Sequence, residues 1–306
     1  MKDKKLQMLI VILGATATGK TDLGIWLAKK YNGEVVSADS RLVYREMNIG
    51  TAKPKNESIG AFVSGGVKHH MINTTSLKKI YNVAIFKERA IKEIKNIGKK
   101  NKNAFLVGGT GLYIDAIVNN IDFPVIPPDE ELRERLEKKT LEKLFDEYRK
   151  LDPLGAEKID KKNKRRLIRA IEVCKLTGRS FWENRRLESP IFDCLEVGID
   201  VPKEELSSKI KKRINIMFKA GLKDEVLALI KKYGNIPPLQ TIGYQEWKNY
   251  TAKEISKKDL EEIKERIFLN TNNFSKRQMT WFKRNKNIHW IKTKKEAEKL
   301  VKEFLK

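Results

Sequence analysis

A glycine-rich octapeptide near the N-terminus has the composition and spacing of a phosphate-binding loop. Residues 14–21 read GATATGKT and match the pattern G-x-x-x-x-G-K-[ST]. They are Gly14, Ala15, Thr16, Ala17, Thr18, Gly19, Lys20 and Thr21. In such a loop, backbone N–H groups turn toward phosphate oxygens, the lysine neutralises the terminal phosphate, and the hydroxyl residue can hold Mg²⁺. The motif predicts a di- or triphosphate ligand without identifying which one.

A single carboxylate is the second candidate for chemistry. Asp39 ends the predicted strand 34–39, so it is expected at the carboxyl edge of a sheet, where ligands bind in open α/β folds. In that position it could act as a general base on an acceptor placed beside the bound phosphates. Ser40 follows directly, and an aspartate that caps a turn explains the pattern equally well.

Two further pairs of residues each leave a functional and a structural interpretation open. His69 and His70 could indicate a metal site, but Cys or His partners at suitable spacing are missing from the sequence. We therefore favour a strand end with local hydrogen bonds. Lys209 and Arg213 lie four residues apart on a predicted helix, so they share one face and could clamp an anion. A solvated helix face explains the same spacing.

A segment near the C-terminus mixes cations with aromatic rings. Residues 276–284 read KRQMTWFKR. Such a mixture suits RNA, because phosphates need cations and splayed bases stack on rings. Trp281 and Phe282 could equally belong to the hydrophobic core.

The segments that must position these residues alternate between buried strands and helices. Strands are predicted at 8–13, a continuous apolar run, and at 34–39 and 104–107, and helical patterns occur at 22–31 and 83–97. This alternation is typical of a parallel, doubly wound sheet with helices on both faces.

The pattern changes at a cluster of prolines, Pro124, Pro127 and Pro128. From there to about residue 188 the chain is charged and helical, and after it 195–201 reads as a strand that returns to the sheet. The remainder is helical except for a short strand at 288–291. The predicted fold class is therefore α/β, with a phosphate-loop, doubly wound parallel sheet, an inserted helical subdomain and a helical C-terminal part. The expected domains are the core in 1–121, the insertion in 122–190, and the completed core with C-terminal helices in 191–306.

Composition and charge narrow the class of protein. The 306 residues contain 40% hydrophobic residues and two cysteines, which excludes a disulfide scaffold and argues against wholesale disorder. The apolar run 8–13 is far shorter than the roughly 20 residues that span a bilayer. We expect a soluble, cytoplasmic protein that does not enter the membrane. The net charge is +24, and nine of the arginines lie between Arg133 and Arg186, which favours a polyanionic partner such as a nucleic acid.

Taken together and in this order, the motifs resemble those of the tRNA dimethylallyltransferases. The resemblance runs from about residue 8 to residue 290. Its stretches are the loop at 14–21, DSRLVY at 39–44, IGTAKP at 49–54, HHMI at 69–72, VGGTGLY at 107–113, RRLIRAIEV at 165–173, QTIGYQE at 240–246 and KRQMTWF at 276–282. The loop alone is generic, whereas the ensemble is specific.

This resemblance implies a reaction and a set of roles. A dimethylallyl group would pass from dimethylallyl diphosphate to the exocyclic amine of the adenosine just 3′ of a tRNA anticodon. Asp39 would take the amine proton, and the loop with Lys20 and with Mg²⁺ at Thr21 would hold the departing diphosphate. The target base would have to leave its stack to reach the site. We expect a monomer with Mg²⁺ as cofactor.

By the same resemblance, a second set of residues is expected to contact tRNA. These residues are Asp39, Ser40, Arg41, Leu42, Thr110, Arg133, Arg165, Arg166, Leu167, Ile168, Arg169, Gln240, Thr241, Ile242, Gly243, Tyr244 and Gln245. Two positions depart from the family pattern in a way that matters. Leu42 replaces a frequent glutamine, and Lys209 replaces an arginine that in the family reaches the diphosphate. Lysine keeps the charge but loses the planar fork, so that role is kept, weakened or passed to Arg213.

Two alternative functions remain open from the sequence. One is a transferase acting on a free nucleotide, either an adenylate isopentenyltransferase or a small-molecule kinase. The surplus of basic residues in 158–186 exceeds what a free nucleotide needs. The other is a tRNA-binding protein without catalysis, which the presence of Lys20, Thr21 and Asp39 disfavours.

Overall fold

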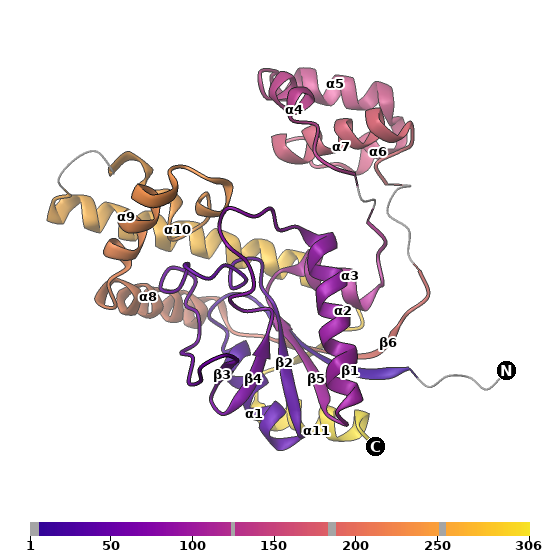
Figure 1. The fold of residues 1–306 in the computed structure, drawn as a ribbon, viewed down its shortest axis with the longest axis vertical. Coiled ribbons are helices and arrows are strands. Elements are labelled where there is room, and N and C mark those ends of the chain that lie inside the picture. The colour runs from indigo at the N-terminus through magenta and orange to yellow at the C-terminus, as the bar shows by residue number, and fades with distance from the viewer. Residues whose placement is uncertain (1–5, 124–125, 183–187, 251–254) are drawn as a thin grey trace. The chain divides into compact units, whose positions relative to one another are not determined.

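The computed structural model describes residues 6–123, 126–182, 188–250 and 255–306, and it divides into two compact units. The first unit consists of residues 1–118 and 190–306, and the second is 119–189. Figure 1 shows the first unit built around a sheet and the second built from helices alone.

The first unit contains a seven-stranded sheet with the strand order β3-β4-β2-β5-β1-β6-β7. All neighbouring strands are parallel except β3 and β4, which form an antiparallel hairpin. The strands are β1 Gln7–Gly14, β2 Gly33–Ala38, β3 Phe62–Ser64, β4 Val67–His70, β5 Asn103–Gly108, β6 Phe192–Ile199 and β7 His289–Ile291. The parallel strand order confirms the predicted doubly wound α/β fold.

Helices cover both faces of this sheet. The helices α1 Lys20–Lys30 and α11 Lys294–Phe304 pack on one face through Leu27 and Val301. The helices α2 Val83–Lys99 and α3 Gly111–Val118 pack on the other face. Met8 to Leu13 of β1 are apolar without interruption because both faces of the strand are covered in this way.

The hairpin of β3 and β4 was absent from the sequence prediction. Its strands have only three and four residues, too few for a periodic pattern. Gly65 and Gly66 form the two-residue turn with φ of 56° and 69°, the left-handed conformation that tight hairpins require and glycine adopts without strain. The hairpin adds His69 and His70 to the sheet beside β2.

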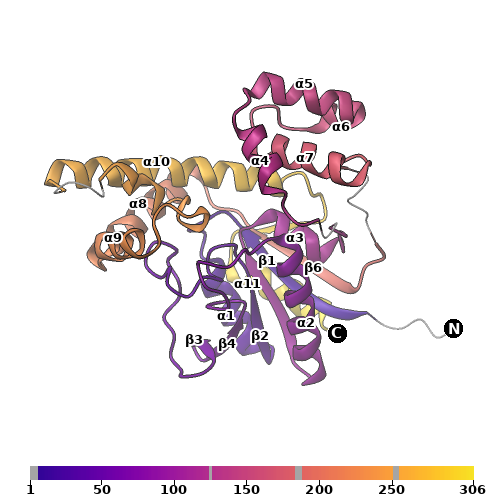
Figure 2. The ribbon, with the colours of Figure 1, turned by 45° about the horizontal axis from the view of Figure 1, so that its top comes forward.

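The C-terminal helices of the first unit share a separate core with the segment after β2. The elements are α8 Lys203–Lys219, α9 Leu222–Tyr233, the 3₁₀ helices η1 Pro237–Leu239 and η2 Gln245–Tyr250, and α10 Lys257–Phe282. Ile263 and Ile267 of α10 lie in this core, whereas Phe282 at its other end packs with the sheet. Figure 2 shows α10 as the long helix alongside α8 and α9.

The second unit is a small helical bundle with its own core. It contains α4 Glu130–Glu137, α5 Leu141–Leu151, α6 Pro153–Lys158 and α7 Lys164–Thr177. Side chains of Asp129, Thr140 and Asn163 cap the starts of α4, α5 and α7. The unit spans 119–189, where the sequence prediction placed an insertion at 122–190. Residues 183–187 of the predicted helical stretch lie outside the described residues.

Within the described ranges, the structure contains no helix long and apolar enough to cross a bilayer.

Candidate active site

The predicted phosphate loop connects β1 to α1 directly. Gly14 ends the strand and Lys20 begins the helix. The backbone adopts positive φ at Ala17 (63°) and Gly19 (88°), and the hydroxyl of Thr18 donates a hydrogen bond of 2.9 Å to the carbonyl of Ala15. The loop therefore turns back on itself in front of the helix N-terminus, where unpaired N–H groups and the helix dipole favour an anion.

Two cations meet at this loop. The ammonium group of Lys20 donates to the carbonyl of Ala15. Arg213 of α8 donates through Nη1 to the hydroxyl of Thr16 at 3.3 Å, and through Nη2 to the carbonyl of Thr51 at 3.2 Å. Burial, and after it the charge of Arg213, lower the pKa of Lys20 to about 7, although Asp39 acts in the opposite direction. Such a concentration of partly buried positive charge is a site for an anion.

The pKa of Lys20 leads to a prediction for pyrophosphate binding. In the free protein at pH 8 most Lys20 side chains are neutral, and a bound anion favours the charged form, so binding should draw in a proton. Calorimetry at pH 8 in buffers of different ionisation enthalpy should show up to about one proton more taken up by the wild type than by Lys20→Met. Protons released by pyrophosphate itself cancel in this comparison. Equal proton numbers for the two proteins would contradict the lowered pKa.

The loop forms one wall of a cavity of about 100 Å³. Its other walls come from the carboxyl half of the sheet, the segment 51–54, α8 and α10. The residues that line it are Thr16, Lys20, Thr21, Val35, Ser37, Asp39, Leu42, Thr51, Ala52, Pro54, His69, Ile72, Val107, Gly108, Gly109, Arg213, Phe274 and Gln278. The loop, the candidate base Asp39 and Arg213 thus line the same cavity.

Asp39 fits both interpretations that the sequence left open. Its Oδ1 accepts hydrogen bonds from the backbone N–H of Arg41 at 2.8 Å and of Leu42 at 3.4 Å, which makes it a turn-capping aspartate. The same side chain lines the cavity beside Lys20 and Arg213. Because both hydrogen bonds go to Oδ1, the turn fixes the carboxylate and leaves Oδ2 as a proton acceptor.

The residues expected beside Asp39 connect its turn to the loop that follows β5 at the same edge of the sheet. The hydroxyl of Thr110 accepts a hydrogen bond from the backbone N–H of Ser40 at 3.2 Å. Ser40, Arg41 and Leu42 are half-buried, and Leu42 lines the cavity. Thr110 is therefore placed beside the candidate base, although its observed hydrogen bond is internal to the protein.

Gln278 of α10 belongs to the predicted motif KRQMTWF at 276–282, but its role in the site was not predicted. Its Oε1 accepts a hydrogen bond from the backbone N–H of Thr16, and its Nε2 donates to the carbonyl of Gly109, both at 2.8 Å. A Cβ at Gly109 would lie 2.4 Å from that Nε2, so a larger residue here would displace the amide of Gln278. The buried amide thereby joins the phosphate loop to the turn after β5. The motif KRQMTWF does not itself indicate that this amide bonds to the phosphate loop.

The segment beside Arg213 is held by Glu225 of α9. Its carboxylate accepts hydrogen bonds from three consecutive backbone N–H groups, Asn48, Ile49 and Gly50, at 2.8 to 3.0 Å. Tyr244 donates a fourth from its hydroxyl at 2.7 Å. This carboxylate fixes the chain just before Thr51, whose carbonyl receives Arg213.

The two cations predicted as a pair on α8 have different surroundings. Arg213 is half-buried and lines the cavity, whereas Lys209 is exposed and forms an ion pair with Glu205 at 2.7 Å. Lys209 is not among the residues that line the cavity in the described part of the chain. Of the two cations, the structure brings only Arg213 to the phosphate loop.

The adjacent histidines point to opposite faces of the sheet. His70 lies on the α2 face, with Nε2 2.7 Å from Oε2 of Glu34 and Nδ1 2.8 Å from Oε2 of Glu93. His69 lies on the other face and lines the cavity. Neighbouring strand residues cannot bind one metal ion together, and the described residues contain no cluster of three or more metal-ligating side chains. The local, structural interpretation therefore holds for His70.

Some residues expected to contact tRNA are buried, and this corrects the prediction for their side chains. Tyr244 is 1% exposed and bonded to Glu225, and Leu167 and Ile168 lie in the core of the helical unit. A buried side chain cannot meet a nucleic acid in this conformation. Of the same group, Gln245 is exposed, and Gln240, Thr241 and Ile242 are half-buried.

The turn at Gly243 is also part of the scaffold. Gly243 adopts a φ of 93°, and its N–H donates to Oε2 of Glu246 at 2.9 Å. A Cβ at this glycine would lie 3.1 Å from the carbonyl oxygen of Gly50. The motif at 240–246 therefore supports the segment that Glu225 holds.

The aromatic residues near the end of α10 are structural as well. Trp281 donates to the carboxylate of Asp115 at 2.9 Å, and Phe282 is 2% exposed within the sheet core. The core interpretation of these two rings is thus the right one.

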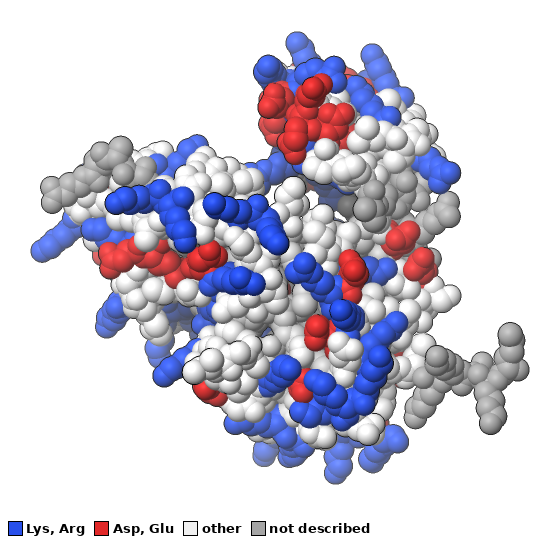
Figure 3. All heavy atoms as spheres, viewed as in Figure 1, with Lys and Arg blue, Asp and Glu red and all other residues white. Residues whose placement is uncertain are grey.

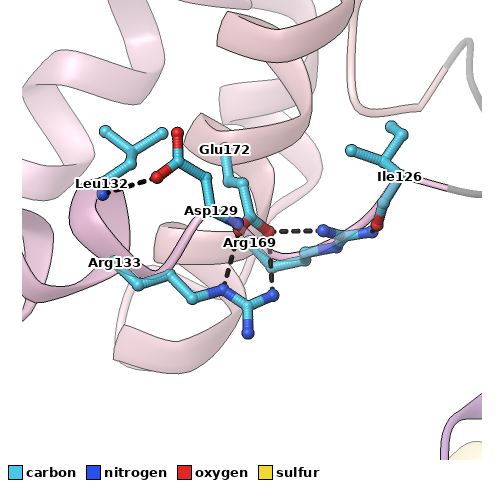
Figure 4. Close-up of polar contacts among 6 residues, drawn as sticks. All are labelled: Ile126, Asp129, Leu132, Arg133, Arg169 and Glu172. Atoms are coloured by element: carbon cyan, nitrogen blue, oxygen red, sulfur yellow. Dashed lines mark hydrogen bonds and ion pairs between the residues drawn. The ribbon is translucent and has the colours of Figure 1, made fainter.

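Two arginines of the helical unit are organised by one buried carboxylate (Figure 4). Glu172, which is 0% exposed, accepts hydrogen bonds from Arg133 at 2.8 and 2.9 Å and from Arg169. Arg169 also donates to the carbonyl of Ile126 at 3.2 Å. Burial alone raises the pKa of Glu172, but these hydrogen bonds outweigh it and lower the pKa. Both guanidinium groups remain partly exposed.

The two other arginines predicted in this unit lie on the same helix. Arg165 and Arg166 belong to the first turn of α7, and the guanidinium carbon of Arg166 lies 5.2 Å from the centroid of the Trp182 ring.

Fold and site together define a phosphate-loop α/β protein with an anion cradle beside a carboxylate. The sequence matches the model of the IPP transferase family over residues 42–285, and the chain belongs to this family. A tRNA dimethylallyltransferase of Pelotomaculum thermopropionicum is 39% identical over 304 residues, covering 97% of this chain and 94% of that protein. A relative of the same name from Finegoldia magna is also 39% identical, over 295 residues and 93% and 91% of the two chains.

Solved structures give the same result for the fold. The full-length tRNA isopentenylpyrophosphate transferase of Bacillus halodurans superposes with a TM-score of 0.69 at 33% identity, covering 98% of this chain and 95% of that one. A eukaryotic dimethylallyltransferase acting on tRNA superposes with a TM-score of 0.75 over 94% of this chain and 74% of that one. At 24% identity, the second likeness shows the fold alone.

Proposed function

We propose that this protein transfers a dimethylallyl group from dimethylallyl diphosphate to the N6 amine of the adenosine 3′-adjacent to the anticodon in tRNA, with release of diphosphate. The observation that carries the proposal is the shared cavity, in which Asp39 lies together with Lys20 and Arg213. The names of the relatives support the same reaction.

The residues of the cavity supply what this substitution needs. The bond between C1 of the dimethylallyl group and the diphosphate oxygen breaks, and a bond between N6 and C1 forms. The loop amides, Lys20 and Arg213 stabilise the negative charge on the departing diphosphate. Asp39 accepts the proton from N6, whose lone pair is delocalised into the purine ring and is therefore a weak nucleophile.

Mg²⁺ fits the oxygen groups at the start of α1. The hydroxyl of Thr21 and the carboxylate of Asp39 both line the cavity, and oxygen ligands are those that Mg²⁺ prefers. A cage of protein ligands is not expected, because Mg²⁺ usually binds through one or two side chains plus substrate phosphates. We propose Thr21 as its protein contact. The ion would add positive charge beside the diphosphate.

The charge of the protein supports a tRNA partner. The net charge is +24, and Lys and Arg side chains are spread over the face in Figure 3 rather than confined to one small patch. The partly exposed Arg133 and Arg169 of the helical unit, with Arg165 and Arg166, are the proposed phosphate contacts there. A tRNA substrate makes the cytoplasm the proposed location. The monomeric state stays a prediction.

A transfer assay tests this function directly. Dimethylallyl diphosphate labelled in the prenyl group is incubated with unmodified tRNA, and in parallel with AMP and with ADP. Label should enter tRNA and not the free nucleotides, and a tRNA with guanosine in place of the target adenosine should stay unlabelled. Label on AMP but not on tRNA would instead identify an adenylate isopentenyltransferase. A protein that phosphorylates an acceptor from ATP and transfers no prenyl group would be a kinase.

A further inference from the structure

The cavity extends inward along one face of the sheet. Val35, Ser37 and Asp39 alternate along β2 and its carboxyl end, and all three line the cavity. His69 of β4 is the direct parallel partner of Val35. Four residues of strand separate Val35 from Asp39, a depth of about 13 Å. Val35 and His69 therefore lie at the inner end, and Asp39 lies at the sheet edge.

The two ends of the cavity differ in chemistry. The end at the sheet edge carries Lys20, Thr21 and Arg213, which suit an anion. The inner end carries Val35 and His69, and Val107 of β5 lies beside Ser37, midway along the cavity. A ligand with a charged head and an apolar tail matches this division, with its tail directed inward.

The imidazole of His69 forms an uncharged part of the inner wall. The residue is 5% exposed, and Nε2 has no hydrogen-bond partner among the described residues. Burial lowers the pKa of His69 to about 4, against a smaller opposing effect of its backbone hydrogen bond with Ser64, so the ring is neutral at pH 7. A buried nitrogen without a partner carries a desolvation cost that an apolar side chain of similar size would avoid. Hydrogen bonding therefore does not explain why a histidine occupies this position.

The ring is also held in place from the side of the hairpin. Phe62 of β3 packs edge to face against it, with ring centroids 6.0 Å apart and an interplanar angle of 72°. Interior packing of this kind leaves little freedom to swing aside. The wall at His69 is therefore rigid.

We propose that His69 closes the inner end of the cavity and thereby limits the prenyl donor to a five-carbon chain. The inference rests on the proposed function and adds to it the residue that sets donor length. A longer chain, such as the ten-carbon geranyl group, needs more room at this inner end than the dimethylallyl group does, and the imidazole occupies that room. Removal of the ring leaves space as far as Phe62.

The test compares two prenyl donors in variants that either remove the ring at position 69 or keep one there. His69→Ala and His69→Val remove the ring, and valine supplies a β-branched side chain of the kind favoured in strands. His69→Phe keeps a ring of similar size as the matched control. The ratio of kcat/KM for geranyl diphosphate to that for dimethylallyl diphosphate, with tRNA as acceptor, should rise at least about tenfold in the Ala and Val variants and stay unchanged in the Phe variant. Ile72→Ala, which removes apolar volume from the cavity wall beyond the end of β4, should not raise the ratio.

The outcomes separate the two levels of the proposal. A wild type that transfers no dimethylallyl group to tRNA contradicts the proposed function itself. A wild type that does so, with Ala and Val variants that use dimethylallyl diphosphate but still reject geranyl diphosphate, overturns the role of His69. A gain shared by His69→Phe or by Ile72→Ala overturns it as well. Pyrophosphate binding and the thermal unfolding temperature of each variant report that it is folded.

Discussion

Asp39→Asn is expected to lower kcat for tRNA prenylation by about 10²- to 10⁴-fold, the range that a positioned general base contributes. Asparagine is nearly isosteric, and its Oδ1 can still accept the hydrogen bonds from Arg41 and Leu42, so the turn should survive. The substitution removes the carboxylate that accepts the proton and keeps the turn. Affinity for pyrophosphate should stay equal or increase, because a negative charge beside the anion site is lost.

The control for this experiment is Asp22→Asn. Asp22 lies in the first turn of α1, two residues after Lys20, and it is exposed. The same change of charge close to the same loop should leave kcat within about twofold, because surface substitutions usually have small effects. Single-turnover transfer and calorimetry with pyrophosphate provide the two readouts. Undiminished turnover in Asp39→Asn would remove Asp39 from the reaction.

Arg213→Leu should lower kcat/KM for dimethylallyl diphosphate by about 10²- to 10³-fold, comparable to the loss of one donor that stabilises developing negative charge. The guanidinium group reaches both Thr16 and Thr51, so it joins the phosphate loop to the opposite wall. Arg213→Lys should retain part of the activity, since it keeps the charge and loses the fork.

Lys209→Leu provides the matched control on the same helix. Lys209 is exposed, paired with Glu205, and one helical turn before Arg213. An exposed ion pair contributes little, so kcat/KM should change by less than about threefold. Steady-state kinetics with the donor varied at saturating tRNA measures both variants. A large loss in Lys209→Leu with a small one in Arg213→Leu would reverse the assignment and return the role to Lys209.

The parts of the molecule that the sequence predicted are those whose signals are local. The loop at 14–21 brings its own glycines, its strand and its helix within a short stretch of chain, so motif and context are read together. The strands β1, β2 and β5 each contain a continuous run of buried residues because both their faces are covered. Asp39 follows from its place at the end of such a strand.

The parts that escaped prediction depend on contacts between distant segments. Gln278 meets Thr16 across 262 residues, and Glu225 meets Asn48 across 177. The helical period placed Lys209 and Arg213 on one face correctly, but it does not indicate which turn of that face meets the phosphate loop. The hairpin that carries His69 is too short to show a period, although its two glycines are a turn signal.

A motif shared with a family also contains two kinds of residue, those at the surface and those in the core. RRLIRAIEV at 165–173 contains arginines at the surface together with Leu167 and Ile168, which form the core beneath them. Glu172 of the same motif orients Arg133 and Arg169 from a fully buried position. Only the folded chain separates residues that can touch a ligand from those that support them.

The amide of Gln278 has a consequence for how the protein matures. During synthesis the phosphate loop is made long before the amide that fastens it to the turn after β5, because Thr16 and Gln278 are 262 residues apart. A nascent chain therefore carries the loop without this hydrogen-bonded support until α10 has been made. Premature termination before α10 would yield fragments that contain the phosphate loop but lack Gln278.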